Sequence, residues 1–468
     1  MKIGLEVHCQ LLTKSKLFCG CPNITAKEPN SVVCDYCIGL PGTKPRINKK
    51  AVDFAIQAAL VLNCKIAGET FFSRKSYFYP DMAKNFQISQ FEIPLAKNGW
   101  LKTGKKKIRI TRLHMEEDPA RIVHVGSITD AKYVLVDYNR SGTPLCEIVT
   151  APDFTSPNEA RQFLQELSSI LEYLSIFDPN LEGSMRVDSN ISLDKNDMKE
   201  AKGIRVEIKN ITGFKDVELA LNYEIIRQKN MLRTGKDIVR ETRAWDAAAG
   251  VTRSLRVKEE EEDYGYIFEG DLPKLTISKE KITEIKKALP ELASEKIKRY
   301  EKQFAVPYSL SVSITSEPDL ADMFEHVIKE IDPMTAANFF AKELKKTLNF
   351  RNLRIKDIKL HPGHIIKLLK LVINNEITIK TAEFTLREMV LNPEDPEEML
   401  KKKTMTMIVD EKTLDPIITK VISNNYRALV DYRTGKKEAF DFLVGQVMRE
   451  TKGRGDPAVI RKLLAKRV

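Results

Sequence analysis

The sequence has few of the residues and runs that mark special classes of protein. Its 468 residues include two tryptophans, six histidines and seven cysteines. No stretch approaches the ~18 consecutive apolar residues of a membrane-spanning helix. Glu6 and His8 interrupt the apolar N-terminus, which therefore lacks the core of a signal peptide. We expect a cytoplasmic protein with no membrane contact, whose cysteines are reduced or bound to metal.

The common nucleotide-binding loops are also missing. Neither a Walker A loop nor the pattern G-x-G-x-x-G is present, so a standard nucleotide-binding fold is not indicated. Hydrophobic residues make up 42% and charged residues 30% of the chain, which is typical of a globular protein. A chain of this length predicts about two to four domains.

Positive charge is concentrated near the C-terminus. The chain carries a formal net charge of +11, and residues 401–468 contain 16 Lys and Arg against 8 Asp and Glu. Such a tail predicts an anionic partner, most often nucleic acid. A solubilising helix surface, or the lysine bias of an AT-rich or heat-adapted genome, would give the same charge. The cations that are candidates by charge alone are Lys401, Lys402, Lys403, Lys452, Arg454, Arg461, Lys462, Lys466 and Arg467.

The hydrophobic pattern predicts a mixed α+β protein. Residues 107–114 and 203–209 alternate with the period of two that is typical of half-buried strands, and Lys97-Asn98-Gly99 is a turn signal. Helices are predicted over residues 49–62 and from Pro157 onward. After about residue 285 the pattern is mostly helical, and it ends in two helices around residues 440–448 and 457–464. The acidic run Glu259–Asp263 is interpreted as a solvated loop.

These patterns divide the chain into three expected domains. Residues 1–285 form a domain with an antiparallel-rich sheet, residues 286–400 form an all-α domain, and residues 401–468 form a helical tail.

Four cysteines form two closely spaced pairs, Cys19-Gly20-Cys21 and Cys34-Asp35-Tyr36-Cys37. Four thiolates favour tetrahedral Zn²⁺, and four protein ligands make a closed, structural site. Four free cysteines or an iron–sulfur site are the alternatives, because the first pair is C-x-C and not C-x-x-C. The other three, Cys9, Cys64 and Cys146, are expected to be buried as small apolar residues.

Carboxylates and a histidine occur at several strand-like positions. Glu6 and His8 are two apart, so on a strand they project from one face. Glu147 lies in an otherwise apolar strand, where a carboxylate is costly unless it is paired or binds metal, and His114 to Asp118 ends another strand-like run. If these segments meet, they form an oxygen-rich site suited to Mg²⁺ or Mn²⁺. Sequence alone does not show that they meet, and glutamates at strand ends usually face water.

Several motifs together resemble those of one protein family, the B subunit of the aspartyl/glutamyl-tRNA amidotransferase. The matching segments are 3–8, 77–81, 87–91, 110–118, 139–145, 186–190, 241–243 and 442–448. The resemblance implies a mixed α/β cradle, a helical domain and a helical tail that contacts tRNA. It also implies a role in translation: ATP phosphorylates the side-chain carboxylate of Asp or Glu on misacylated tRNA, and ammonia then displaces the phosphate.

The resemblance implies partners and site residues as well. Ammonia would come from an amidase A subunit, with a small C subunit completing a heterotrimer. The family's Mg²⁺ ligands fall on Glu6, His8, Glu117 and Glu147, and Lys75 and Lys84 match basic positions that contact phosphate or line a channel. In members that hold zinc, the ligands fall on the two cysteine pairs.

The chain departs from the family at Tyr264–Asp271, where an Arg and two Pro of the usual motif are missing. The role of that loop is therefore open. A related archaeal E subunit has an inserted domain for which this chain has no room. Two other interpretations are a non-catalytic, zinc-containing RNA-binding protein and a metal-dependent phosphohydrolase that acts alone. The sequence does not distinguish Asp-tRNA from Glu-tRNA as the substrate.

Overall fold

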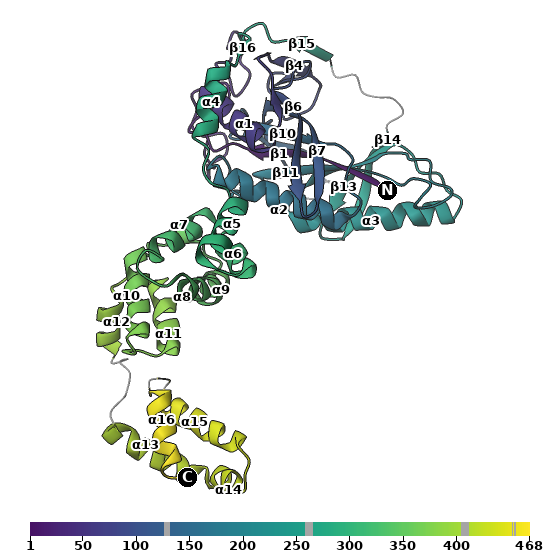
Figure 1. Ribbon diagram of the computed structural model, residues 1–468. Coiled ribbons are helices and arrows are strands. Elements are labelled where there is room, and N and C mark those ends of the chain that lie inside the picture. Colours follow the sequence, from purple (N-terminus) through teal and green to yellow (C-terminus); the bar gives the residue numbers. More distant parts are fainter. Residues whose placement is uncertain (126–131, 258–264, 404–410, 452, 454) are drawn as a thin grey trace. The chain divides into compact units, whose positions relative to one another are not determined.

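A computed structural model describes the whole chain except residues 126–131, 258–264, 404–410, 452 and 454 (Figure 1). The chain divides into two compact units, Met1–Leu292 and Ala293–Val468. The first contains the sheets and the second is helical, as the predicted α+β class requires. The acidic run Glu259–Asp263 lies outside the described residues.

A nine-stranded sheet forms the centre of the first unit. Its strands lie in the order β14-β13-β12-β11-β1-β10-β7-β6-β2, and neighbours are antiparallel except for the parallel pair β12 and β13. In chain order the strands are β1 (Lys2–Gln10), β2 (Lys65–Ile66), β6 (Ala96–Thr103), β7 (Lys106–Glu117), β10 (Pro144–Thr150), β11 (Met185–Ser192), β12 (Val206–Ile211), β13 (Glu241–Asp246) and β14 (Val251–Val257).

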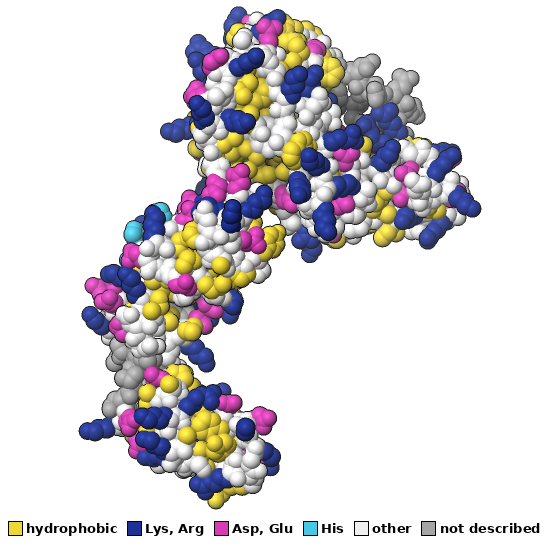
Figure 2. All heavy atoms as spheres, viewed as in Figure 1, with side chains coloured by type: hydrophobic (Ala, Val, Ile, Leu, Met, Phe, Trp, Pro, Cys, Tyr) yellow, Lys and Arg dark blue, Asp and Glu magenta, His cyan; other side chains and the backbone are white. Residues whose placement is uncertain are grey.

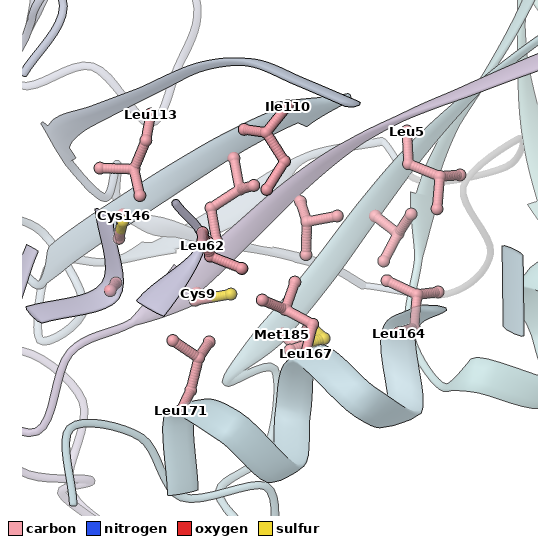
Figure 3. Packing of buried hydrophobic residues seen from close by; sticks show 14 of the residues in the cluster. Leu5, Cys9, Leu62, Ile110, Leu113, Cys146, Leu164, Leu167, Leu171 and Met185 are labelled. Atoms are coloured by element: carbon pink, nitrogen blue, oxygen red, sulfur yellow. The ribbon is translucent and has the colours of Figure 1, made fainter. Parts of the chain in front are cut away.

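Three helices pack against this sheet: α1 (Lys49–Val61), α2 (Pro157–Tyr173) and α3 (Phe214–Arg233). Helix α2 begins as predicted, since the Ser156 side chain accepts a hydrogen bond from the Glu159 N–H and Pro157 occupies the first helical position. Its apolar side chains, including Leu164 and Leu167, point at the sheet (Figure 3). The three isolated cysteines are all buried, as expected.

Smaller sheets and one helix complete this unit. They are β3 (Glu69–Thr70) with β16 (Leu275–Thr276), β4 (Ser73–Ser76) between β5 (Phe86–Ser89) and β15 (Gly265–Phe268), and β8 (Arg121–His124) with β9 (Val134–Asp137). Helix α4 (Lys279–Lys287) packs on α1, and Leu289 and Leu292 join the same core, so the unit extends past residue 285.

The predicted turn at Lys97-Asn98-Gly99 is wrong, because these residues lie inside β6. Gly99 is required there by a close approach: a Cβ atom would lie 2.2 Å from Cys64 Sγ and 2.6 Å from the Leu62 carbonyl oxygen. Asn98 has a φ of +59°, a conformation that asparagine tolerates better than most residues. The Asn-Gly pair thus serves packing and not chain reversal.

The second unit consists of helices. They are α5 (Ala293–Phe304), α6 (Tyr308–Ile314), α7 (Pro318–Val327), α8 (Pro333–Asn338), the π-helical turn η1 (Phe339–Leu344), α9 (Lys345–Arg351), the 3₁₀ turn η2 (Ile355–Asp357), α10 (Pro362–Ile373), α11 (Ile379–Met389), α12 (Pro396–Lys403), α13 (Glu411–Asn424), α14 (Tyr426–Arg433), α15 (Glu438–Glu450) and α16 (Pro457–Ala465). Their buried apolar residues form two separate clusters, over residues 300–400 and 414–464. On the visible face of α13 to α16, Lys and Arg surround a group of hydrophobic side chains (Figure 2).

Candidate active site on the polar face of the sheet

The alternation of β1 separates its core side chains from its polar ones. Leu5, Val7 and Cys9 are buried in the core, while Glu6 and His8 project from the opposite face. We call this side, opposite α2, the polar face. It carries the side chains that the sequence singled out in β1.

Cross-strand pairing brings further ionisable groups to the polar face. His8 lies opposite Glu147 of β10 and, on its other side, opposite Arg186 of β11. Glu147 in turn lies opposite His114 of β7. Side chains directly opposite each other in an antiparallel pair share a face. Four strands therefore contribute to one cluster.

The closest group in this cluster consists of His8, Glu116 and Glu147. His8 Nε2 lies 3.3 Å from a Glu147 oxygen and 3.5 Å from a Glu116 oxygen. Their possible ligand atoms all lie within 4.8 Å of one another. His114 Nε2 is 3.1 Å from Glu147, which makes it a supporting neighbour of the group. Glu116 and Glu147 are buried, with 3% and 6% of their surface exposed.

Negative charge dominates the electrostatics of this face. Burial disfavours the His8 cation, but the hydrogen bond and charge of Glu147, together with the charges of Glu116 and Asp188, raise the pKa of His8 to about 9. Burial, followed by the charges of Glu147, Asp188 and Glu207, raises the pKa of Glu6. Within the group, burial opposes ionisation of Glu147, but the charges and hydrogen bonds of His114 and His8 hold the pKa of Glu147 well below its ordinary value. Two carboxylates and an imidazole there suit Mg²⁺ or Mn²⁺.

Glu117 does not join this group. Glu116 lies opposite Leu145 and Glu117 opposite Pro144, so consecutive residues of β7 leave opposite faces of the strand. The Glu117 carboxylate accepts hydrogen bonds from Lys84 Nζ at 2.7 and 2.8 Å, from the Ile88 N–H at 3.0 Å and from the Tyr36 hydroxyl at 3.2 Å. Lys84 thus pairs with Glu117.

Glu6 and Lys75 are not members of the His8–Glu116–Glu147 group. Glu6 Oε1 accepts a hydrogen bond from Asn190 Nδ2 at 3.1 Å. Lys75 is in β4, where it lies opposite Tyr266 of β15. Burial raises the pKa of Tyr266, and the charges of Lys75, Glu147 and Glu116 also act on it. The variant segment that begins at Tyr264 therefore passes within electrostatic range of the carboxylates. Tyr264 itself lies outside the described residues.

A cavity of about 870 Å³ adjoins the group. Two of its lining residues are neighbours of His8. Gln10 lies two residues further along β1, and Arg186 lies opposite His8 in β11. Arg121 and Arg140 also line the cavity, and the buried Asp118 lies 2.7 Å from Arg186 and 3.5 Å from Arg140. Asp137 and Glu182 line the cavity as well, and Glu182 lies 3.6 Å from Arg121. The lining therefore carries charges of both signs, and its guanidinium groups could contact an anionic ligand.

The four paired cysteines come together at a second place in the same unit. Cys37 Sγ lies 3.7 Å from Cys19, 3.8 Å from Cys34 and 3.9 Å from Cys21. Sulfur atoms about 2.3 Å from a tetrahedral zinc ion are roughly 3.8 Å apart, so the cluster is compatible with zinc. A hydrogen bond from Cys19 and the charge of Lys16 lower the pKa of Cys37 to about 4, although burial opposes the shift.

Sequence reasoning missed Glu116, the arginine-lined cavity and Lys16. The period of two within β7 was a signal for Glu116, since His114 and Glu116 share a face. The arginines come from β8, β11 and the segment after β9. No local spacing links them.

An α+β body with a carboxylate–imidazole group, an adjoining cavity that contains three arginines and a separate four-cysteine cluster fits the class of enzymes that act on anionic substrates. Residues 1–283 match the family model described as "GatB/GatE catalytic domain", and residues 322–468 match "GatB domain". The B subunit of the aspartyl/glutamyl-tRNA(Asn/Gln) amidotransferase of Carboxydothermus hydrogenoformans is 45% identical, over 99% of this chain and 97% of its own. That of Thermotoga maritima is 43% identical, over 99% and 98%.

The chain therefore belongs to the B-subunit family of the aspartyl/glutamyl-tRNA(Asn/Gln) amidotransferases, and it is a subunit of a glutamine-dependent ligase. The resemblance seen in the sequence motifs is confirmed. Among the described residues, no helix is both long and apolar enough to cross a membrane.

Proposed function

We propose that this subunit activates the side-chain carboxylate of Asp or Glu on misacylated tRNA and then forms the amide. A carboxylate oxygen attacks the γ-phosphorus of ATP and ADP leaves. Ammonia attacks the acyl carbon, and inorganic phosphate leaves with the bonding electrons. The observation that carries this proposal is the position of His8, Glu116 and Glu147 beside a cavity lined by arginines.

The residues of the polar face divide this work between them. His8, Glu116 and Glu147 would hold Mg²⁺, which neutralises phosphate charge during phosphoryl transfer. His114 orients Glu147 through its contact of 3.1 Å. Glu6 adds negative charge beside the group, as a ligand or as a neighbour. The sequence resemblance proposes Glu117 as a ligand, but its contacts with Lys84 favour a role on the other side of β7.

The cavity supplies binding and orientation for the substrates. Arg121, Arg140 and Arg186 present guanidinium groups to phosphate oxygens. Both ATP and the 3′ end of tRNA carry such oxygens. Lys75 lies opposite Tyr266, whose pKa is also influenced by the charges of Glu147 and Glu116, and it would contact a phosphate at the edge of the site.

The four-cysteine cluster and the basic tail have roles in stability and in binding partners. The four cysteines would hold a structural Zn²⁺. An amidase A subunit would deliver ammonia, with a small C subunit completing a heterotrimer. The basic tail, residues 401–468, would hold the tRNA by its phosphates. We also propose that the chain has the three domains expected from the sequence: residues 1–285, 286–400 and 401–468.

One reconstitution tests the proposal. The chain is purified with amidase and small subunits and supplied with glutamine, ATP, Mg²⁺ and each misacylated tRNA in turn. We expect amide product and ADP with Asp-tRNA, Glu-tRNA or both, and ADP formation that depends on the misacylated tRNA. No amide product with either tRNA would refute the proposal, and ATP hydrolysis independent of tRNA would favour a phosphohydrolase.

A further inference from the structure

A buried lysine contacts the four-cysteine site. Lys16 is 1% exposed, and its ammonium group donates to the Val32 carbonyl at 3.0 Å, to Cys37 Sγ at 3.3 Å and to the Tyr138 carbonyl at 3.4 Å. A buried cation is stable only beside compensating negative charge. Four thiolates around one divalent ion leave a net charge of about −2. Lys16 therefore balances part of the charge that a metal-bound cluster would carry.

The segment before β10 contacts the chain on both sides of the cysteine site. The N–H of Leu17, the residue after Lys16, donates to the Gly142 carbonyl at 2.8 Å. The adjacent Ser141 hydroxyl donates to the Cys37 carbonyl at 3.2 Å. The segment that leads into β10 thus holds both Lys16 and the second cysteine pair in place.

The second cysteine pair flanks a tyrosine whose hydroxyl contacts a lysine and a glutamate. Tyr36, between Cys34 and Cys37, is 5% exposed. Its hydroxyl donates to Glu117 Oε2 at 3.2 Å and accepts from Lys84 Nζ at 2.9 Å. The Lys84 ammonium also lies 4.0 Å from the centre of the Tyr36 ring, which is a favourable cation–π distance.

We propose that the four-cysteine site, besides stabilising its own loop, holds Tyr36 as a positioning residue for the Lys84–Glu117 pair. Lys16 is the donor that balances the negative charge of that site. The sulfur cluster fixes the backbone on both sides of Tyr36, because Cys34 and Cys37 are its near neighbours in the chain. Tyr36 then fixes the ammonium of Lys84 against Glu117. Metal occupancy and the geometry of this pair are thereby coupled.

The test compares metal content with the chemical reactivity of Lys84 in the full chain. Acetic anhydride labels free amines, and mass spectrometry follows the labelling rate of each lysine as a function of pH. Tyr36→Phe removes only the hydroxyl. We expect this variant to retain zinc and to show a several-fold faster labelling of Lys84. Labelling of Lys274, an exposed lysine paired with Glu69, should not change.

Tyr300→Phe is the matched control, because Tyr300 is also buried and its hydroxyl also donates to a carboxylate, that of Glu325, at 2.8 Å. It lies in the second unit, so Lys84 should label as in the parent protein. Lys16→Met should release zinc to a chelator several-fold faster than the parent. Neither measurement requires the amidation reaction, so their failure is distinguishable from failure of the proposed function.

Three results would overturn the proposal. The first is Lys84 labelling in zinc-loaded Tyr36→Phe that matches the parent at every pH. The second is loss of zinc from Tyr36→Phe, which would make the tyrosine a part of the loop's own fold. The third is unchanged zinc release from Lys16→Met.

Discussion

Glu116 and Glu117 are consecutive in β7, but their carboxylates lie in different clusters. Glu116 lies 3.5 Å from His8 on the polar face, whereas Glu117 lies 2.7 Å from Lys84 on the other side of the strand. The neutral substitutions Glu116→Gln and Glu117→Gln are therefore a matched pair. They remove equal charge at neighbouring positions.

We expect the two substitutions to affect the enzyme differently. Glu116→Gln should raise the Mg²⁺ concentration needed for half-maximal activity and lower kcat by about two orders of magnitude, since a metal ion stabilises a transferring phosphoryl group by several kcal/mol. Glu117→Gln should leave the Mg²⁺ requirement unchanged, and it removes the charged partner of Lys84. A Mg²⁺ titration of activity in both variants measures this. A larger Mg²⁺ effect in Glu117→Gln would restore Glu117 as the ligand.

Cation binding at the polar face should depend on pH in a definite direction. The pKa of His8 is raised to about 9 by Glu147, Glu116 and Asp188, against the effect of burial. His8 is then protonated at neutral pH, and a metal ion must displace that proton. We expect Mn²⁺ affinity, measured by electron paramagnetic resonance, to rise up to about tenfold per pH unit below pH 9 and then to level off. His8→Gln should abolish this slope.

The same raised pKa bears on the stability of the metal-free protein. Protonated His8 stabilises the folded state fully below the ordinary histidine pKa of about 6.5. This contribution is lost as pH rises through about 9. Unfolding by denaturant at pH 6 and pH 9.5, with and without Mg²⁺, measures it. Mg²⁺ should offset the loss at the higher pH, because it replaces the proton between the carboxylates.

Local patterns in the sequence predicted the α+β class, and they singled out His8 and Glu147, two of the three residues that lie together on the polar face. Alternation in β1 placed Glu6 and His8 on one face, because strand geometry is local. The family motif contains both Glu116 and Glu117; alternation along β7 places Glu116 on the same face as His114, and strand pairing then brings that face to His8. Gly99 indicated a turn, but a close approach to Cys64 explains it. Lys16 had no signal at all, since its partners Val32 and Tyr138 are far apart in sequence.

Zinc removal should destabilise the first unit in particular. Binding to the four thiolates contributes directly to folding free energy, and Lys16 would be left buried beside less negative charge. We expect one zinc ion per chain by elemental analysis and, after chelation, a fall in Tm of about 5–10 °C for the unit that contains the sheet. Cys21→Ser should show the same fall without chelator. Absence of zinc from the purified protein would contradict the assignment.

Salt dependence should reveal what the C-terminal cations do. Some are paired within the tail, as Arg461 is with Asp441 and Arg467 with Asp415, whereas Lys462 and Lys466 are exposed. Each lysine–phosphate contact releases a counterion, so log affinity falls with log salt in proportion to the number of contacts. Lys462→Gln with Lys466→Gln should lower this slope by up to about two and weaken tRNA binding uniformly. Deletion of residues 401–468 should lower the salt slope further.

Lys274→Gln, on the first unit, is the control and should leave the slope unchanged. If the truncated chain keeps full affinity for tRNA at physiological salt, the charge of the tail is only a solvated surface.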